Sequence, residues 1–301
     1  YINPYLLYIY HMNNNIFQEI ENNTQMFLDN ITDHKLLEKI ILKANDLYHN
    51  GTPALFDDTY DLLVEKLTEM RPSSKVLKAI GAPVKENKAQ LPYHMGSMNK
   101  IKPEDTKKFN KWRNTYPGPY VLSYKLDGIS ALLCVSKNNQ KLYTRGNGTI
   151  GQDISHLLKY INLNINDIID YITEENIENI CLRGELIMKK NTFYSKYNDN
   201  PNPRNFVSGV INSKSPNKNI IPDIDLVFYE VIHPWHKIDS QFEIMTAINV
   251  NVVQHDLIDK KNLTIPALSN ILKDAKQNSE YEIDGIIISD TNNHNRNIAD
   301  N

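Results

Sequence analysis

The chain has 301 residues, of which 41% are apolar, so it is long enough for a sizeable core and for two domains. Its 33 basic and 36 acidic side chains give a formal net charge of −3, which excludes a globally basic nucleic-acid coat protein but not a local basic groove. No apolar run reaches the ~18 residues that a membrane-spanning helix needs, so we expect no membrane association.

The two cysteines, Cys134 and Cys181, are too few for a disulfide framework or for a four-cysteine zinc site. Both stand in apolar runs, so we interpret them as small buried apolar side chains. Unpaired cysteines are typical of a reducing compartment, and we therefore expect an intracellular protein.

The first third of the chain has the periodicity of helices. Apolar residues from Leu36 to Leu47 lie on one helical face, which predicts an amphipathic helix that ends near residue 49. Asp57 is the expected N-cap of a second helix, which ends before Arg71 and Pro72. We expect a linker at 80–83, and we divide the chain into a helical domain with an N-terminal extension, residues 1–84, and a second domain, residues 85–301.

From about residue 92 the pattern changes to strands bounded by turns. We expect strands over 121–126, 129–135, 142–145, 180–188, 226–232 and 283–289, and helices over 153–161 and 266–275. Strands and helices that mix without a regular βαβ alternation predict an α+β fold, with antiparallel sheets and flanking helices.

Lys125-Leu126-Asp127-Gly128 follows the first of these strands. A lysine at a strand end, beside an acid and a glycine turn, is a candidate nucleophile toward phosphorus if burial or a neighbouring cation lowers its pKa. The same four residues also fit an ordinary surface lysine before a β-turn.

Two further charged segments follow or interrupt predicted strands. Arg145 is a candidate phosphate or ribose ligand, although the Gly-Asn-Gly that follows it is also typical of a hairpin turn. Arg183 and Glu185 interrupt an apolar strand, and charged side chains are rarely buried unless they are paired. This pattern favours a polar cleft over a plain core.

The order and spacing of these segments resemble the nucleotidyltransferase motifs of covalent ligases, and most closely the adenylylation domain of NAD-dependent DNA ligases. The matching residues are Lys125-x-Asp127-Gly128, Arg145-Gly146, Arg183-Gly184-Glu185, the loop Asn202-Pro203-Arg204-Asn205, and Asp284-Gly285. The resemblance implies the covalent nucleotidyltransferase fold. It also implies that Lys125 attacks the α-phosphate of NAD, releases nicotinamide mononucleotide (NMN), and passes AMP to the 5′-phosphate of a nick in double-stranded DNA.

The resemblance also assigns roles to single residues. It implies catalytic roles for Lys125, Asp127 and Glu185. It implies contacts with the nucleotide for Gly128, Arg145, Arg204 and Asp284, and for Ser97 and Met98 on the adenine side.

The helical part resembles the small domain that holds the NMN half in this family, on Tyr48, His49, Asp57, Tyr60 and Asp61. Aromatic rings can stack on nicotinamide, and carboxylates can bind ribose hydroxyls and offset the positive charge of the ring. The alternative is a helical hairpin whose tyrosines are part of the core.

Several positions depart from the family pattern. The resemblance predicts a lysine where Ser289 stands, a glutamate at Ser123, an aspartate at Asn147 and an arginine at Asn212, and it predicts Lys276 as the substitute for another arginine. Loss of one preorganised charge near the α-phosphate lowers a rate by ~100-fold or more.

Partners and metal follow from the same resemblance. Magnesium is implied by phosphoryl chemistry, and because the sequence has no metal-ligand spacing, we expect phosphate oxygens and water to hold the ion. A basic stretch from Lys100 to Arg113 fits contacts with DNA phosphates and equally fits a solvated helix face. The parts that wrap DNA in this family are not among the 301 residues, so nick sealing is expected to need a further C-terminal region or a partner. We expect a monomer, and a divergent or viral member from an AT-rich genome.

Two other functions remain open. Ser289, Ser123 and Asn212 favour a catalytically impaired, ligase-like protein that binds nucleotide or DNA. An ATP-dependent ligase or capping-type enzyme would share the lysine motif, but the residues at 48–61 argue against it. We rank the NAD-dependent enzyme first.

Overall fold

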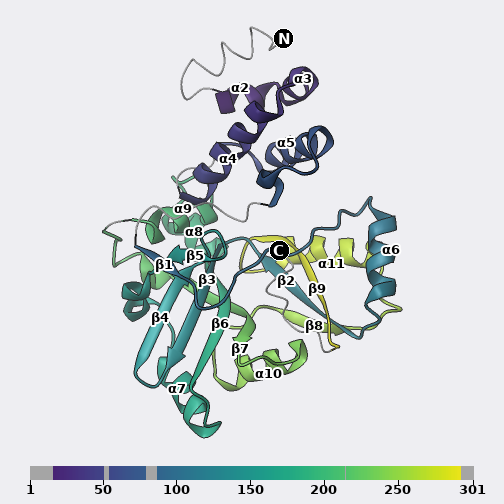
Figure 1. Ribbon diagram of the computed structural model, residues 1–301. Helices are drawn as coiled ribbons and strands as arrows, with labels where there is room; N and C mark the ends of the chain where they lie inside the picture. The colour runs from purple at the N-terminus through teal and green to yellow at the C-terminus, as the bar shows by residue number, and fades with distance from the viewer. Residues whose placement is uncertain (1–15, 51–53, 79–86, 214, 293–301) are drawn as a thin grey trace.

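The computed structural model describes residues 16–50, 54–78, 87–213 and 215–292 (Figure 1). Within these ranges, a helical region at the top of the view lies above antiparallel sheets with flanking helices. The predicted α+β fold, with helices before the sheets, is confirmed. The predicted N-terminal extension up to residue 15 and the linker predicted at 80–83 lie outside the described ranges.

The helical region packs amphipathic helices around a core of its own. Its elements are α2 (Ile16–Asn22), α3 (Thr24–Asn30), α4 (His34–Asn50), α5 (Asp57–Met70) and a 3₁₀ turn at Lys75–Lys78. Leu37 and Ile41 of α4 and Leu63 and Leu67 of α5 follow helical spacing and are buried against one another. This burial explains the apolar periodicity of the first third of the chain.

The start of α5 differs from the prediction. Asp57 is the first helical residue, and Phe56 takes the N-cap position, so the prediction of Asp57 as N-cap is wrong. The Phe56 N–H donates to the carboxylate of Glu21. A side chain of α2 therefore satisfies a backbone N–H group at the start of α5 that has no partner within the helix.

One sheet of the described chain has the strand order β8-β2-β9. Its strands are β2 (Tyr120–Leu126), β8 (His255–Ile258) and β9 (Ile283–Asp290), with α6 (Thr106–Thr115) and α11 (Ile265–Asn278) beside them (Figure 1). Phe109 of α6 packs with Tyr120 and Leu263 in a small buried cluster, which attaches α6 to this sheet.

A second sheet of the described chain has the order β4-β3-β6-β7. Its strands are β3 (Ile129–Ser136), β4 (Asn139–Thr144), β6 (Asn179–Met188) and β7 (Ile224–His233), and its flanking helices are α7 (Ile165–Glu174), α8 (Lys190–Lys196), α9 (Pro203–Ile211) and α10 (Ile238–Ala247). β6 is buried from Ile180 to Met188, at the centre of the largest core.

The six predicted strands all form, with small shifts at their ends. The strands β1 (Lys88–Gln90), β5 (Ile150–Gln152) and β8 were not predicted, because each is too short to show an alternating pattern. The helix predicted over 266–275 is part of α11, whereas the segment 153–161 forms a 3₁₀ helix at Ser155–Tyr160.

The segment 202–205, interpreted as a loop, opens α9 instead. Asn202 is the N-cap, and its side chain accepts a hydrogen bond from the Asn205 N–H at 2.8 Å. Pro203 stands at the first helical position, where its missing N–H costs no hydrogen bond. This cap places Arg204 in the first turn of a helix.

Cys181 is buried and Cys134 packs against the same apolar cluster, as predicted, but a disulfide joins the two residues, which was not predicted. The register of β3 and β6 places the two residues opposite each other, with their Cα atoms 4.2 Å apart. Local patterns do not reveal this pairing, because 47 residues separate the cysteines in the chain. The argument from unpaired cysteines for a reducing compartment no longer applies.

Candidate active site

The lysine motif lies where the chain passes from one sheet to the other. Asp127 and Gly128 alone connect β2 with β3, which belong to different sheets. Antiparallel pairing of β2 with β9 places Lys125 opposite Gly285, and the Lys125 amine contacts the Asp284 carboxylate. The Lys125 side chain is 48% exposed, so a substrate can reach the amine.

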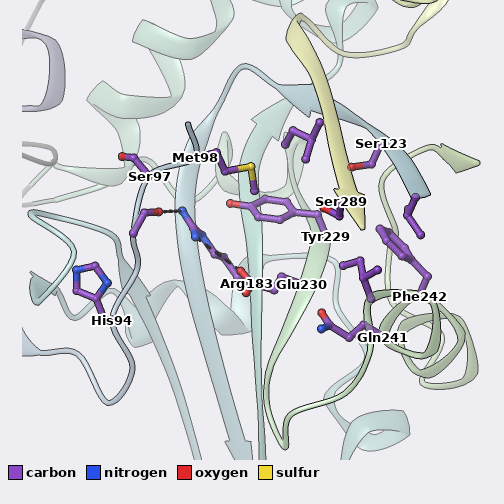
Figure 2. A pocket seen from close by; sticks show the side chains of 14 residues that line it. His94, Ser97, Met98, Ser123, Arg183, Tyr229, Glu230, Gln241, Phe242 and Ser289 are labelled. Carbon is purple, nitrogen blue, oxygen red and sulfur yellow. Dashed lines mark hydrogen bonds and ion pairs between the residues drawn. The ribbon is translucent and has the colours of Figure 1, made fainter. Parts of the chain in front are cut away.

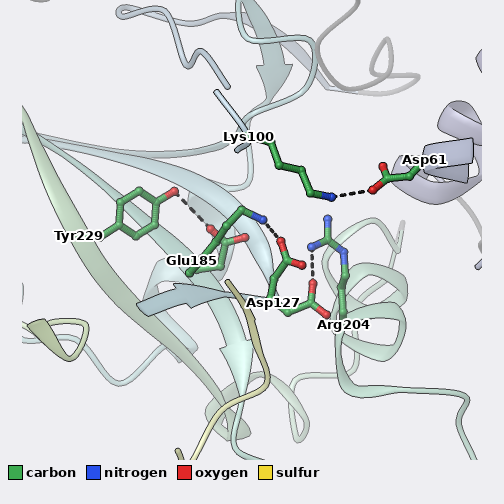
Figure 3. A network of polar contacts seen from close by, with 8 residues as sticks. Asp61, Lys100, Asp127, Glu185, Arg204 and Tyr229 are labelled. Carbon is green, nitrogen blue, oxygen red and sulfur yellow. Dashed lines mark hydrogen bonds and ion pairs between the residues drawn. The ribbon is translucent and has the colours of Figure 1, made fainter. Parts of the chain in front are cut away.

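Arg204 connects this motif with the helical region. Its Nη1 donates a hydrogen bond to Asp127 Oδ1 at 2.7 Å (Figure 3). Its guanidinium carbon lies 4.6 Å from the centre of the Tyr48 ring. Tyr48 is on α4, so one cation contacts a residue of each region. The site is therefore assembled from both parts of the chain.

Glu185 is the buried acid of the site, with only 8% of its surface exposed on β6. Burial raises the pKa of its carboxyl, and nearby cations oppose that rise: Arg204, Arg183, Arg145 and Lys125. The Tyr229 hydroxyl donates to Glu185 Oε2 at 3.3 Å (Figure 3). A buried carboxylate among cations can steer an amine or accept a proton from it.

The environment of Lys125 favours its neutral form. Burial is the largest cause that lowers the pKa of this amine below the ordinary 10.5, and the charges of Arg204 and Lys100 lower it further. Glu185 and Asp127 oppose that shift. Because the neutral amine is the nucleophile, the lowered pKa raises the reactive fraction at neutral pH.

A cavity of ≈ 280 Å³ lies between the two sheets (Figure 2). Residues of the segment before β2, of the β2–β9 pair and of the β6–β7 pair line it, among them Ser97, Met98, Ser123, Ser289, Arg183 and Tyr229. An aromatic ring, a thioether and a few polar groups around a concave space are suited to a planar heterocycle.

Arg183 was predicted to lie in a polar cleft but was given no role, and Tyr229 was not predicted at all. Arg183 is 7% exposed, its Nη2 donates to the Gly96 carbonyl at 2.9 Å, and its guanidinium carbon lies 5.7 Å from the centre of the Tyr229 ring. The charged interruption of an apolar strand was the signal for Arg183. Tyr229 stands in an ordinary strand pattern, which gives no such signal.

The residues predicted to hold the NMN half have different environments. Tyr48 contacts Arg204, and Asp61 accepts from the Lys100 amine at 2.6 Å (Figure 3). Tyr60 is half-buried against the helical core, where burial raises the pKa of its hydroxyl, as the alternative of a core tyrosine predicts. The side chains of His49 and Asp57 lie outside the described residues.

The four residues that depart from the family pattern lie in three different places in the structure. Ser123 and Ser289 line the cavity from neighbouring strands, so they contribute hydroxyls and no charge to its wall. The Asn147 side chain accepts from the N–H groups of the two residues at 149 and 150, at 3.1 and 2.8 Å, and so forms the turn after β4. Asn212 is the C-cap of α9.

Arg145 and Lys276 complete the predicted set. The Arg145 N–H donates to the Ser130 carbonyl at 3.0 Å, and burial followed by the charge of Arg183 lowers the pKa of the Arg145 guanidinium. Lys276 is exposed on α11, and among the described residues no contact joins its side chain to Lys125. Its role therefore stays a prediction.

Gly128 occupies a position without room for a side chain, because a Cβ there would lie 2.5 Å from the Leu186 carbonyl oxygen and 2.8 Å from Glu185 Cγ. Gly128→Ala forces the turn away from β6, and we expect it to lower the free energy of unfolding by about 1–3 kcal/mol, measured by urea denaturation.

Gly209→Ala is the matched control. A Cβ at Gly209 in α9 meets nothing within 4 Å, and alanine is the better helix former, so this change should raise the free energy of unfolding by about 0.5–1 kcal/mol. Equal effects of the two substitutions would contradict the close approach at Gly128.

Within the described ranges no group of three or more His, Cys, Asp or Glu side chains is placed to hold a metal ion. Over the same residues no helix has the length and apolar character needed to cross a membrane. The acids near Lys125 contact cations: Asp127 contacts Arg204, and Asp284 contacts Lys125 itself.

Known proteins similar to this chain are DNA ligases. A DNA ligase of Acanthamoeba polyphaga mimivirus is 47% identical over 275 residues, which are 90% of this chain and 42% of that relative. A DNA ligase of Clostridioides difficile (strain 630) is 26% identical over 289 residues, 86% of this chain and 41% of that relative. The chain thus spans about two fifths of the length of these curated relatives.

Among solved structures, a Naegleria gruberi RNA ligase with ATP and Mn aligns with 76% of this chain and 66% of its own, with a TM-score of 0.42 and 10% sequence identity. The sequence family described as NAD-dependent DNA ligase adenylation domain matches residues 85–297, which is most of the chain. The chain therefore belongs to the NAD-dependent DNA ligase adenylation domain family.

Proposed function

We propose that this chain is the adenylylation module of an NAD-dependent DNA ligase, in which Lys125 attacks the α-phosphate of NAD and becomes a lysyl-AMP adduct. One observation carries the proposal: the Lys125 amine has a lowered pKa and contacts Asp284 at the junction of two sheets that also enclose a cavity. Membership of the adenylation-domain family supports the same reaction.

The chemistry at Lys125 is a substitution at phosphorus. The neutral amine forms an N–P bond to the α-phosphorus, the bond from that phosphorus to the bridging oxygen breaks, and the oxygen leaves with the electron pair as the phosphate of NMN. The amine proton passes to a nearby carboxylate or to solvent. Asp127 and Glu185 steer the amine or bind ribose, and Arg145 and Arg204 contact phosphate or sugar.

The two halves of the dinucleotide have separate places in this proposal. The cavity with Ser97 and Met98 takes the adenine, and Tyr229, which lines this cavity, donates a hydrogen bond to Glu185. The NMN half lies on the helical region, against a set that the resemblance supplies: Tyr48, His49, Asp57, Tyr60 and Asp61. Lys276 remains a predicted contact of the nucleotide. The division at residues 84 and 85 is part of the same proposal.

Magnesium fits the site only as an ion carried by phosphates. The described residues offer no cluster of three ligating side chains, and Asp127 and Asp284 already contact cations. Mg²⁺ retains water and binds phosphate oxygens readily, so the ion would neutralise the diphosphate without a protein cage.

Nicked double-stranded DNA is the proposed recipient of AMP, because the relatives are DNA ligases. Since the chain spans about two fifths of those relatives, sealing of the nick is assigned to the whole protein and not to this module. We propose that the module acts as a monomer inside the cell, where nicked DNA is found.

Labelling tests the proposal. The chain is incubated with magnesium and either NAD or ATP, each labelled in the adenylate part, and protein-bound label is measured after denaturation. We expect label from NAD and little from ATP. If NAD gives no adduct, the proposed function is wrong for this chain, and label from ATP alone would select an ATP-dependent enzyme.

A second candidate is a ligase-like protein that binds nucleotide or DNA without catalysis. The hydroxyl of Ser289 in the cavity wall favours it, because the family pattern has a lysine there. This candidate predicts NAD binding by calorimetry without any covalent adduct over hours.

A further inference from the structure

Lys100 connects the cavity segment with the helical region. It lies in the segment between β1 and α6, two residues after Met98, which lines the cavity. Its amine donates to Asp61 Oδ2 of α5 at 2.6 Å (Figure 3). Its positive charge also lowers the pKa of the Lys125 amine. Lys100 thus reaches toward the helical region on one side and toward the nucleophile on the other.

The proposed function requires a diphosphate in this same interval. If Asp61 contacts the NMN half and Lys125 attacks the α-phosphorus, the two phosphates must run between these residues. The amine of Lys100 donates to Asp61, is near enough to Lys125 for its charge to lower the pKa of that amine, and presents up to three N–H donors. The position at 289, which has a lysine in the family pattern, offers only a hydroxyl here.

The contacts of Lys100 allow an exchange of partner. Its side chain is 71% exposed, and the Asp61 carboxylate is 39% exposed, so the ion pair between them is a surface pair that contributes little to stability. The backbone of Lys100 is held separately, because the Lys108 amine donates to its carbonyl at 2.7 Å. The side chain can therefore turn from a carboxylate to a phosphate while the segment stays in place.

We propose that Lys100 binds the diphosphate of the dinucleotide on the NMN side and stabilises the negative charge that develops on the NMN phosphate as it leaves. This inference rests on the proposed function and adds a residue to it. The ammonium acts on the bridging oxygen, which takes the electron pair of the breaking P–O bond, while the new N–P bond forms at Lys125. Lys100 itself gains and loses no covalent bond.

Lys102 provides a matched control on the same segment. Its amine contacts Glu65, which like Asp61 is on α5, so Lys102 also joins the two regions. The charge of Lys100 is among the five largest influences on the pKa of Lys125, and the charge of Lys102 is not among them. If the two lysines only hold the regions together, Lys100→Ala and Lys102→Ala should lower the labelling rate alike. If Lys100 binds phosphate, only Lys100→Ala should lower that rate strongly.

The first experiment measures single-turnover labelling from NAD. We expect Lys100→Ala and Lys100→Gln to lower the rate at saturating NAD by ~100-fold, as for other preorganised charges, and Lys100→Arg to recover part of it. Lys102→Ala should stay within about threefold of the wild type. Thermal unfolding of each variant shows whether the fold is kept.

The second experiment measures binding without reaction, in the Lys125→Ala background. We expect a further Lys100→Ala change to weaken NMN binding about tenfold by calorimetry, the loss of one charge-assisted hydrogen bond. Binding of nicotinamide riboside, which has no phosphate, should not change.

The outcomes separate this inference from the proposed function. If wild-type protein takes no label from NAD, the proposed function fails. If the wild type is labelled but Lys100→Ala and Lys102→Ala behave alike, or NMN and nicotinamide riboside lose equal affinity, the proposed function stands and the role of Lys100 is wrong.

Discussion

Lys125→Ala is expected to abolish the covalent adduct with adenylate while leaving the fold intact. The side chain is half-exposed at the end of β2, so its removal opens no core cavity, but it removes the amine that must form the N–P bond. Lys125→Arg should be equally inactive, because a guanidinium does not lose its proton in a protein. Labelling from NAD and a thermal melt measure the two effects.

Lys141→Ala is the control for this prediction. Lys141 lies on β4, outside the lysine motif. Its amine forms an ion pair with Asp153 at 3.0 Å. Its removal should leave labelling unchanged. Adduct formation by Lys125→Ala at the wild-type rate would show that another residue is the nucleophile.

The pH dependence of labelling follows from the same amine. Burial, Arg204 and Lys100 lower the pKa of Lys125, against Glu185 and Asp127, and Asp284 contacts the amine directly. A pKa below 10.5 means that the neutral fraction, and with it the rate, rises with pH and reaches half of its maximum below pH 10.5. A midpoint at or above pH 10.5 would contradict the lowered pKa.

Arg204→Gln is expected to lower the rate of labelling by ~100-fold or more, because Arg204 is the cation that joins the motif to the helical region. The glutamine side chain lacks the positive charge that pairs with Asp127 at 2.7 Å, and it lacks the cation–π contact with the Tyr48 ring. Removal of the cation also raises the pKa of Lys125, so the pH profile should move to higher pH. Arg204→Lys should recover only part of the rate, since lysine lacks the planar fork.

Lys196→Ala controls for the loss of an ion pair near α9. Lys196, on the preceding helix, pairs with Asp223 at 2.9 Å and is not among the largest influences on the pKa of Lys125. We expect this variant to keep the rate and the pH profile of the wild type. If Arg204→Gln has the same labelling rate and pH profile as Lys196→Ala, the role that we assign to Arg204 between Asp127 and Tyr48 is wrong.

Much of the local structure was predictable because it depends on short-range patterns. The apolar stripe of α4 and the six longer strands each show their period within one segment, and the lysine motif stands at the end of such a strand. The 3₁₀ helix at Ser155–Tyr160 and the short strands β1, β5 and β8 were missed or misassigned, since they have too few residues to show a period.

The candidate site was predictable as a set of residues but not as an arrangement. Asn202 shows that even a local feature was misread, because its capping of α9 decides where the Arg204 guanidinium points. The Tyr229 ring reaches the cavity only through the pairing of β6 with β7. Lys100 was counted in a basic stretch, and nothing in the sequence indicated that it lies beside Asp61.

The amino-acid sequence by itself determined most of the helices and strands, the family resemblance and the choice of Lys125 as the proposed nucleophile, because residue type and spacing along one segment are sufficient for each. Only the tertiary structure decided that Lys125 meets Asp284 across 159 residues, that Arg204 lies between Asp127 and Tyr48, and that the cysteines form a disulfide. These contacts depend on the register of distant strands and on the packing of helices against them. Register and packing are set by the burial of the whole core, which no local pattern specifies.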